Sequence, residues 1–384
     1  MALYHENAYV KKFKTNISKI IKFEDTYGLI LEKTYFYPES GGQLADKGKI
    51  NNIDVINVIK RNDEIVHIVK NKPKSESVEC YINWDRRYDF MQQHTGQHLL
   101  SAVIDDKYQS ETVSFHMSEE YSFIDIDIPK LGEKTIKEIE NEVNSLIWEN
   151  KVINTFWIDP DKIDSYDIRK QGKYDEKIRM VEIEDVDLSM CGGTHVSEIC
   201  EIGMLKITNA EKVKENTFRI YFRCGRRALQ YFQSINIMIN NLSSILSVKR
   251  SEIVKMAKKF KKDRENYYHE IENLKERLID EKLKNIKTNS RKIVYDTVND
   301  IDNNALNYYA NQILQTNTKI AILYDTVQKF LLIRQKGNEY NLKEIGNSII
   351  SRYSAKGGGS ELIFQIVNIE ISNLKNEIIE RYIK

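Results

Sequence analysis

The heptapeptide MCGGTHV, residues 190–196, places Cys191 and His195 four positions apart across two glycines. Glycine at positions 192 and 193 permits a tight reversal of the backbone, so that both side chains converge on one point. A thiolate and an imidazole together are good ligands for a transition-metal ion. An isolated CxxxH spacing is nevertheless unremarkable, and a metal site requires further ligands.

A second pair of candidate ligands occurs upstream in QQHTGQHLL, residues 92–100. His94 and His98 are four apart in a helical pattern, so both imidazoles project from one face of the helix. Spacing alone leaves surface or core histidines open, but three of the seven histidines of the chain fall in these two segments. The mixed nitrogen and sulfur ligands favour zinc. Asp185 and Asp187 are candidates to orient a ligating imidazole, with solvated loop acids as the alternative.

The composition of the 384-residue chain excludes several classes of protein. Its 58 Lys and Arg against 57 Asp and Glu leave a net charge of +1, so any contact with nucleic acid requires a local basic patch. Four cysteines are too few for a disulfide scaffold. The N-terminal residues lack the apolar run of a signal peptide, and no stretch of about 18 apolar residues occurs. We therefore expect a cytoplasmic protein with no contact with membranes.

Outward from the two motifs, the pattern predicts an α+β protein with two N-terminal domains. Residues 1–88 contain short extended runs between Gly, Asn, Asp and Pro, which predicts a small antiparallel sheet or β-barrel. Residues 89–224 predict an α+β domain with an antiparallel sheet, which would contain the zinc site. Its helices are expected at 89–106 and 133–151, and its strands at YSFIDIDI, INTFWI, KIRMVEIED, GMLKITNAEKV and TFRIYFRC.

The rest of the chain changes in character after residue 224. Residues 225–289 predict a helical segment, and the part from about 250 to 287 is highly charged and lacks Gly and Pro. Apolar residues recur there at spacings of three, four and seven with one irregularity, which favours a two-helix hairpin or a dimeric coiled coil; they are Ile253, Met256, Phe260, Tyr267, Ile271, Leu274 and Leu278. Residues 290–384 alternate strands and helices and predict a small α/β domain with a glycine-rich loop at 356–360.

Several separated motifs resemble one family, the editing domain of alanyl-tRNA synthetases and its free-standing AlaX-type relatives. TYFYPESGGQLADKG (34–48) resembles the glycine-rich motif of the family's N-terminal barrel. QQHTGQHLL resembles its first metal motif, and KIRMVEIEDVDLSMCGGTHV (177–196) its second. TVSFHMSEEYSFIDI (112–126) is similar to a segment typical of the free-standing proteins. Order and spacing agree over residues 20–225.

The C-terminal part resembles the C-terminal domain of the same synthetases more loosely. A helical hairpin precedes an α/β domain with KGGGS and Gln365, although IVNI follows Gln365 where the family usually has further glycines. Few residues precede the barrel, so we expect no aminoacylation core and no charging activity. The resemblance also implies ATP binding.

The resemblance implies hydrolysis of the ester that joins serine or glycine wrongly to tRNA(Ala). A synthetase pocket sized for alanine rejects glycine and serine poorly, so a second site must remove the error. One zinc ion would be held by His94, His98, Cys191 and His195. Four permanent protein ligands close a tetrahedral site, which favours positioning of the substrate over generation of hydroxide.

Three further residues are expected near the substrate. Thr95 and Gln97 share the helix with two ligands, with a core or exposed role as the alternative, and the family often has threonine at position 97. His116 in SFHMS is expected either near the scissile ester or on a strand face.

Contacts with RNA are expected at a glycine-rich turn and at two basic stretches. Gly41, Gly42 and Gln43 predict a turn whose backbone N–H groups can meet a phosphate. Arg226 and Arg227 end KVKENTFRIYFRCGRR, a basic stretch with interleaved aromatic residues. VKRSEIVKMAKKFKKDR (248–264) is a second such stretch, although a charged helix face is usually only solvated.

Other functions fit the same features. One is an RNA-binding module in which zinc is structural and the coiled segment binds a partner; another is a hydrolase of free D-amino or peptidyl esters. A homodimer through the coiled coil or the C-terminal domain is a further expectation.

Overall fold

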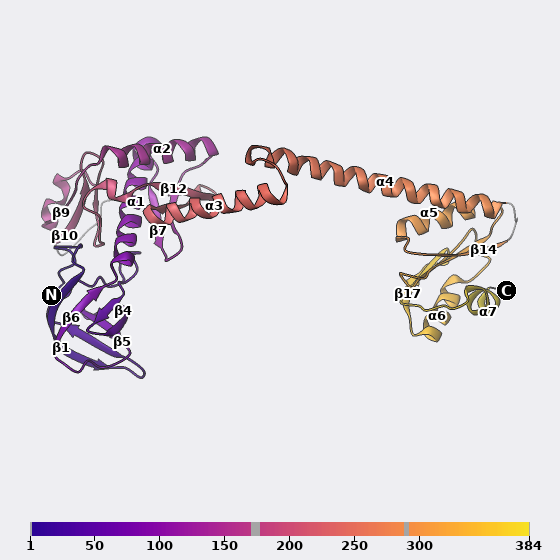
Figure 1. Cartoon of the computed structure of the whole chain (residues 1–384), viewed down its shortest axis with the longest axis horizontal. Helices are drawn as coiled ribbons and strands as arrows, with labels where there is room; N and C mark the ends of the chain where they lie inside the picture. The colour runs from indigo at the N-terminus through magenta and orange to yellow at the C-terminus, as the bar shows by residue number, and fades with distance from the viewer. Residues whose placement is uncertain (1, 170–176, 288–291, 384) are drawn as a thin grey trace. The chain divides into compact units, whose positions relative to one another are not determined.

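The computed structural model describes residues 2–169, 177–287 and 292–383 (Figure 1). The chain divides into two compact units, Met1–Asn241 and Leu242–Lys384. Strands and helices are mixed in both units, which confirms the expected α+β class. None of the helices in the described ranges combines the length and the apolar character that a bilayer crossing requires.

Six antiparallel strands close the N-terminal barrel in the order β1-β2-β5-β4-β3-β6. The sequence left a sheet or a barrel open, and the structure confirms the barrel. Its interior is filled by apolar side chains such as Leu29, Phe36 and Val58, none of which is exposed. The strands are β1 (Lys12–Lys22), β2 (Tyr27–Leu31), β3 (Gly48–Ile50), β4 (Ile53–Arg61), β5 (Glu64–Val69) and β6 (Ser77–Ile82).

Helix α1 (Trp84–Tyr108) follows the barrel directly and carries the first pair of candidate ligands. Asn83 caps it by accepting a hydrogen bond from the backbone N–H of Arg86, so the helix begins earlier than the apolar pattern predicted. Every side chain from Phe90 to Ile104 is buried. A helix that is buried on all sides needs no amphipathic pattern, and its histidines therefore lie inside the protein.

Two antiparallel sheets pack with α1 in one hydrophobic core, where the sequence predicted a single sheet. Both sheets contribute apolar residues to this core, for example Val181 and Ile220. The first sheet has the order β11-β10-β9 and the second β12-β13-β8-β7. The elements are β7 (Thr112–Met117), β8 (Ser122–Asp127), α2 (Glu133–Glu149), β9 (Ile153–Ile158), β10 (Ile178–Ile183), β11 (Asp187–Met190), β12 (Leu205–Lys214) and β13 (Thr217–Cys224), with short 3₁₀ turns at Pro160–Ser165 and Ile199–Ile202.

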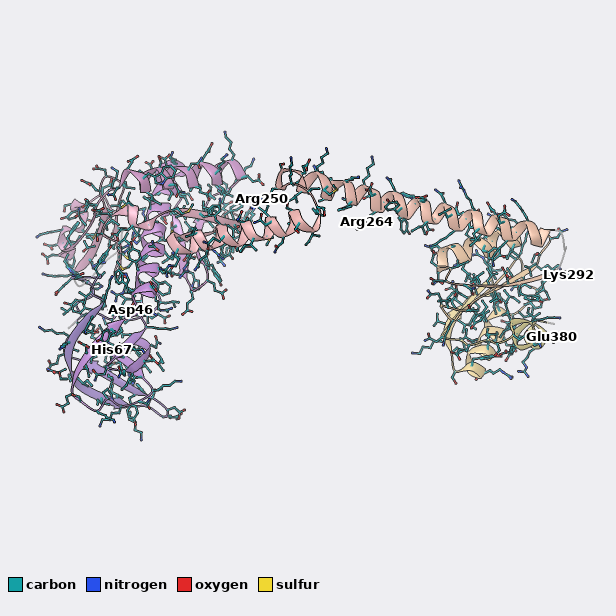
Figure 2. The ribbon with its side chains drawn as sticks, in the orientation of Figure 1. Asp46, His67, Arg250, Arg264, Lys292 and Glu380 are labelled. Carbon is teal, nitrogen blue, oxygen red and sulfur yellow. The ribbon has the colours of Figure 1, made fainter. Side chains whose placement is uncertain are left out.

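A buried ion pair joins α1 to the barrel. The guanidinium of Arg87 donates to the carboxylate of Asp46, and both side chains are almost fully enclosed. Arg87 also donates to the backbone oxygens of Ala8 and Tyr35. Figure 2 shows Asp46 at the end of the barrel that meets α1. Removing one partner from such a pair strands a charge in the interior and typically costs about 3–5 kcal/mol.

The remaining helices divide between the two units. Helix α3 (Gly225–Ile245) begins directly after β13, and α4 (Ile253–Lys287) follows a 3₁₀ turn at Arg250–Glu252. Ile279 and Leu283 of α4 are buried in the core of the second unit, whereas Tyr267 and Ile271 are exposed. Residues 288 and 289, the end of the predicted helical segment, lie outside the described residues.

The second unit contains a five-stranded sheet in the order β14-β15-β16-β18-β17. Only the β14–β15 pair is parallel among its described pairs. Its elements are β14 (Ile293–Val298), α5 (Asn303–Leu314), β15 (Ile320–Asp325), β16 (Phe330–Gln335), α6 (Leu342–Tyr353), β17 (Lys356–Gly359), β18 (Ile363–Val367), a π-helical turn at Lys375–Ile379 and α7 (Glu380–Tyr382).

The prediction of a glycine-rich loop at 356–360 is wrong for most of this stretch, because Lys356–Gly359 form the edge strand β17. A Cβ on Gly357 would lie 2.2 Å from the backbone oxygen of Gln365, and one on Gly359 would lie 2.1 Å from that of Ile363. The two glycines therefore allow β17 to approach β18 closely. A side chain at Gly358 would meet no atom within 4 Å.

One histidine, His67, lies inside the barrel among the residues that the structure describes. The imidazole of His67 is fully buried, donates from Nδ1 to the backbone oxygen of Leu29 and accepts at Nε2 from the hydroxyl of Thr34 (Figure 2). The backbone N–H of Phe36 donates to the same hydroxyl. Burial lowers the pKa of His67 to about 4, against a smaller opposing effect of the Leu29 carbonyl. The neutral ring thus completes the barrel interior.

We predict that this ring makes the stability of the first unit pH-dependent. Between pH 6.5 and 4 the unfolded chain binds a proton that folded His67 excludes, so the free energy of unfolding falls by about 3 kcal/mol as the pH falls through this window. His67→Leu should be less stable at neutral pH and should lose the part of the dependence that His67 contributes, while the buried His195 keeps its own contribution. Denaturant unfolding with a chelator present, followed by the fluorescence of Trp84, Trp148 and Trp157, measures it.

The matched control is His269→Leu, because His269 is exposed on α4. It should keep the pH dependence of the wild type. An equal dependence in the wild type and in His67→Leu would contradict the assignment.

Candidate metal centre

The two predicted ligand pairs meet in the first unit. His94 and His98 of α1, and Cys191 and His195 of the segment after β11, bring one ligand atom each within 4.8 Å of one another. Nε2 of His94 and Nε2 of His195 both lie 3.3 Å from Sγ of Cys191. Ligand atoms around a tetrahedral zinc ion are about 3.5 Å apart, given bonds of about 2.0–2.3 Å. The group is therefore close to the size that one metal ion requires.

His94 is oriented by a residue of the barrel. Its Nδ1–H donates to Oε1 of Gln43 at 2.9 Å, which leaves Nε2 free to face Cys191. The amide of Gln43 is held in turn by Thr194, whose backbone N–H donates to Oε1 and whose hydroxyl accepts from Nε2. A partner that fixes the tautomer and the orientation of the ring is typical of metal-ligating histidines.

His98 is oriented by a polar chain on β11. Its Nδ1–H donates to the hydroxyl of Ser189 at 2.8 Å, and Ser189 donates to Oδ2 of Asp187 at 2.9 Å. The guanidinium of Arg169 binds the same carboxylate. Asp187 thus has the predicted orienting role, whereas Asp185 is exposed and lies 3.7 Å from Lys151.

His195 is held by a residue that the sequence placed near the substrate. Its Nδ1–H donates to the hydroxyl oxygen of Thr95 at 3.2 Å, and the backbone N–H of Val196 donates to the same oxygen. Thr95 therefore contacts a candidate ligand from the turn between His94 and His98. All three imidazoles are engaged through Nδ1, so each can present Nε2 to a common ion.

The loop around Cys191 depends on one glycine and one arginine. A Cβ at position 193 would lie 2.1 Å from Cε1 of His94, so only glycine fits there, whereas position 192 is open. One nitrogen of the buried Arg179 donates to the backbone oxygens of Cys191 and Gly193. The predicted reversal therefore rests on Gly193 rather than on both glycines.

The ligands influence one another's protonation. Burial raises the pKa of the Cys191 thiol, but the facing imidazoles outweigh burial and place it well below its ordinary value. Burial lowers the pKa of His98, yet the Cys191 thiolate and Asp187 raise it to about 9. Burial lowers the pKa of His195 to about 3, so this ring is neutral. Binding of a metal ion through His98 would therefore require loss of the His98 proton.

A cleft of about 360 Å³ opens beside the ligands. Gln97 lines it, and its amide nitrogen donates to Ser101. Phe115 and Arg169 also line it, and sequence reasoning missed both. Phe115 stacks on His94 with ring centroids 5.6 Å apart. The sequence had instead indicated the next residue, His116, as a candidate near the substrate. The full lining is Gly41, His94, Gln97, His98, Thr112, Val113, Ser114, Phe115, Arg169, Ser189, Met190 and Cys191.

The other predicted site residues are distributed as follows. His116 is exposed on β7 and contacts Phe123, so it lies on a strand face and is not part of the cleft lining. Gly41 and Gly42 form an exposed turn with positive φ angles. Arg226 has an exposed side chain 3.4 Å from Asp85.

Arg227 differs from its neighbour. Its side chain is buried and donates to the carboxylate of Asp89 and to the backbone oxygen of Ser118. Through these contacts Arg227 joins α3 to α1 and to the end of β7. A contact of Arg227 with RNA stays a prediction. Gln43, predicted for the same role, is buried as well.

Two family profiles match the chain. The profile for the threonyl and alanyl tRNA synthetase second additional domain matches residues 178–221, which include Cys191 and His195. The profile for class II (A) tRNA synthetases matches residues 3–86, the barrel.

Individual relatives extend these matches. An alanyl-tRNA editing protein, AlaX-L, of Pyrococcus horikoshii is 30% identical over 94% of this chain and 92% of its own length. The alanyl-tRNA editing protein Aarsd1 of Bos taurus is 34% identical over 61% of this chain and 53% of its own length. An alanine–tRNA ligase of Methanococcus vannielii is 27% identical over 94% of this chain, which spans 41% of that ligase.

We predict that Gln43→Ala weakens metal binding by about 10- to 100-fold, since loss of an orienting partner has this effect at other metal sites. Competition with a chromogenic chelator measures the affinity. The control is Glu39→Ala, an exposed substitution in the same segment, which should leave the affinity unchanged. Equal affinities for the wild type and Gln43→Ala would show that Gln43 does not orient a ligand.

Proposed function

Since the chain belongs to the family of AlaX-type alanyl-tRNA editing proteins, we propose that its cleft removes serine or glycine from misacylated tRNA(Ala). The chain is an aminoacyl-tRNA deacylase that hydrolyses the ester in trans. The observation that supports the site is the convergence of His94, His98, Cys191 and His195, because the first three of these residues also line the cleft. We leave ATP outside the proposal, because hydrolysis of an ester requires no nucleotide.

The four residues suit one zinc ion. A thiolate and three imidazoles form a mixed sulfur and nitrogen set, and the Nδ1 partners leave each Nε2 available. When bound, zinc would supply positive charge that anchors the amino group of the substrate or a water molecule. Four protein ligands complete a tetrahedron, so this positioning role is favoured over activation of water on the metal.

The residues of the cleft would divide recognition between them. Gln97 lines the cleft and offers Oε1 as an acceptor for the hydroxyl group of a seryl ester. Thr95 would act through His195, which it contacts, rather than on the ester. Gly41 lines the cleft from a turn whose backbone N–H groups can bind a phosphate oxygen. The exposed Arg226 is the second proposed contact with RNA.

We predict that wild-type protein supplied with zinc accelerates release of serine from Ser-tRNA(Ala), and that Cys191→Ala reduces this rate by at least about 100-fold, because three ligands hold the ion less well. Acid-precipitable aminoacyl-tRNA, followed over time, measures the rate. Cys200→Ala is the control, since Cys200 is exposed and lies outside the ligand group.

Two outcomes would count against the proposal. No acceleration by the metal-loaded wild type with serine, glycine and other mischarged tRNAs would refute the deacylase. A Cys191→Ala variant that loses thermal stability and RNA affinity together would favour the alternative, an RNA-binding module with a structural zinc ion.

We further propose that two copies of the chain pair through α4. Tyr267, Ile271, Leu274 and Leu278 are more than half exposed and repeat at spacings of three and four, which suits a helical seam. Analytical ultracentrifugation should give a mass that rises with concentration, and Ile271→Asp with Leu274→Asp should abolish the rise. Glu270→Ala, an exposed polar substitution, is the control. A mass independent of concentration in the wild type would contradict the pairing.

A further inference from the structure

The sheet β12-β13-β8-β7 has one covered face and one open face. Ile124, Ile220 and Phe222 point into the core around α1. Because side chains alternate along a strand, their neighbours lie on the opposite face. Four aromatic side chains gather there, and we call this group the aromatic face: His116, Tyr121, Phe123 and Tyr221.

The rings of the aromatic face form a continuous set. His116 and Phe123 are paired across β7 and β8, with ring centroids 5.2 Å apart. Phe123 and Tyr221 are paired across β8 and β13, with centroids 5.6 Å apart. Tyr121, at the turn before β8, lies 5.9 Å from Tyr221 and is 40% exposed. His116 and Tyr121 are exposed and Phe123 and Tyr221 are half-buried, so the rings form a partly exposed surface that suits a ligand with flat, apolar faces.

Two arginines border the aromatic face. Arg219 lies over Phe123 at 3.8 Å from the ring centre, and the carboxylate of Asp125 fixes its guanidinium from the side. Arg223 lies over Tyr231 at 5.2 Å. Nε of Arg223 is enclosed and has no hydrogen-bond partner among the residues that the structure describes. Glu211, which accepts from the hydroxyl of Tyr221, shows that this is not a uniform positive patch.

The aromatic face continues from the cleft. Ser114 lines the cleft and donates to Asp125, and Asp125 in turn binds Arg219. These three residues are cross-strand neighbours on β7, β8 and β13. His116 of the aromatic face lies on β7, two residues after Ser114, so the aromatic face begins on the edge strand that lines the cleft.

We propose that the aromatic face binds the unpaired 3′ end of the tRNA. The proposal rests on the function proposed above and adds the place where the RNA lies. With the ester in the cleft, the preceding unpaired nucleotides must leave along a neighbouring surface. Exposed aromatic rings stack on bases of any identity, and arginine both stacks and binds phosphate. Tyr121 and Tyr221 stack on the bases, the guanidinium of Arg219 over Phe123 offers a further stacking surface, and Arg223 binds a backbone phosphate.

The test is binding of uncharged tRNA(Ala), measured by fluorescence anisotropy with the full-length, metal-loaded protein. Tyr121→Ala should weaken binding by at least about 5-fold, since loss of a stacked ring has at least this effect. Tyr121→Phe keeps the ring and should bind like the wild type. Trp148→Ala removes an exposed aromatic residue of α2, outside the aromatic face, and should also bind like the wild type.

Truncated RNA locates the contact. With tRNA(Ala) that lacks its unpaired 3′ nucleotides, Tyr121→Ala and the wild type should bind equally. Arg223→Gln should lower the slope of log affinity against log salt concentration by about one, as expected for one lost phosphate contact. Zinc content and melting temperature verify that the variants are folded.

Three results would overturn the proposal: no loss of affinity in Tyr121→Ala, an equal loss with the truncated tRNA, or a change in the mass of Tyr121→Ala by ultracentrifugation, which would identify the aromatic face as a protein interface. The readout uses uncharged tRNA. Failure of deacylation would therefore refute the proposed function without deciding this one.

Discussion

The buried ion pair between Asp46 and Arg87 determines how the barrel meets α1, and the candidate metal centre depends on that junction. A guanidinium without access to water must find all its partners within the protein, and here the carboxylate and two backbone oxygens provide them. The pair therefore fixes one register between the barrel segment and the helix. Gln43 precedes Asp46 by three residues, and His94 follows Arg87 by two helical turns, so the same register places Gln43 on His94.

Local spacing was sufficient to predict the two candidate ligand pairs. His94 and His98 share a helix face because the helix has 3.6 residues per turn, and Cys191 and His195 converge because their loop is short. Short extended runs between turn residues predicted most strands, although for residues 1–88 they left a sheet or a barrel open. Local spacing could not predict the residues that orient the histidines, since Gln43 and Ser189 approach them only after distant segments pack together. Gly41 and Gly42 suggested that Gln43 lies in an exposed turn that contacts RNA, yet the side chain of Gln43 is buried.

The strand β17 shows the opposite limit of local reasoning. Three consecutive glycines favour a loop, because glycine loses the most conformational freedom on ordering. The backbone of β18 leaves no room for a Cβ at positions 357 and 359, so the composition that suggests a loop is what permits the strand. Gly358 lacks this steric reason. A single sequence does not reveal such a constraint, since it arises from the distance between two strands.

Because α1 is buried, a substrate can reach its histidines only through the cleft. The candidate ligands His94 and His98 lie inside the core, so they have little freedom to move. A substrate must reach them past the turn at Gly41 and the strand β7, which line the cleft. Phe115 occupies one wall by stacking on His94, and the next residue on β7 points to the opposite face of the sheet. Adjacent residues of the edge strand β7 therefore face the cleft on one side of the sheet and the aromatic face on the other. A substrate that is part amino acid and part nucleic acid needs both surfaces, an enclosed one for the ester and an open one for the chain that carries it.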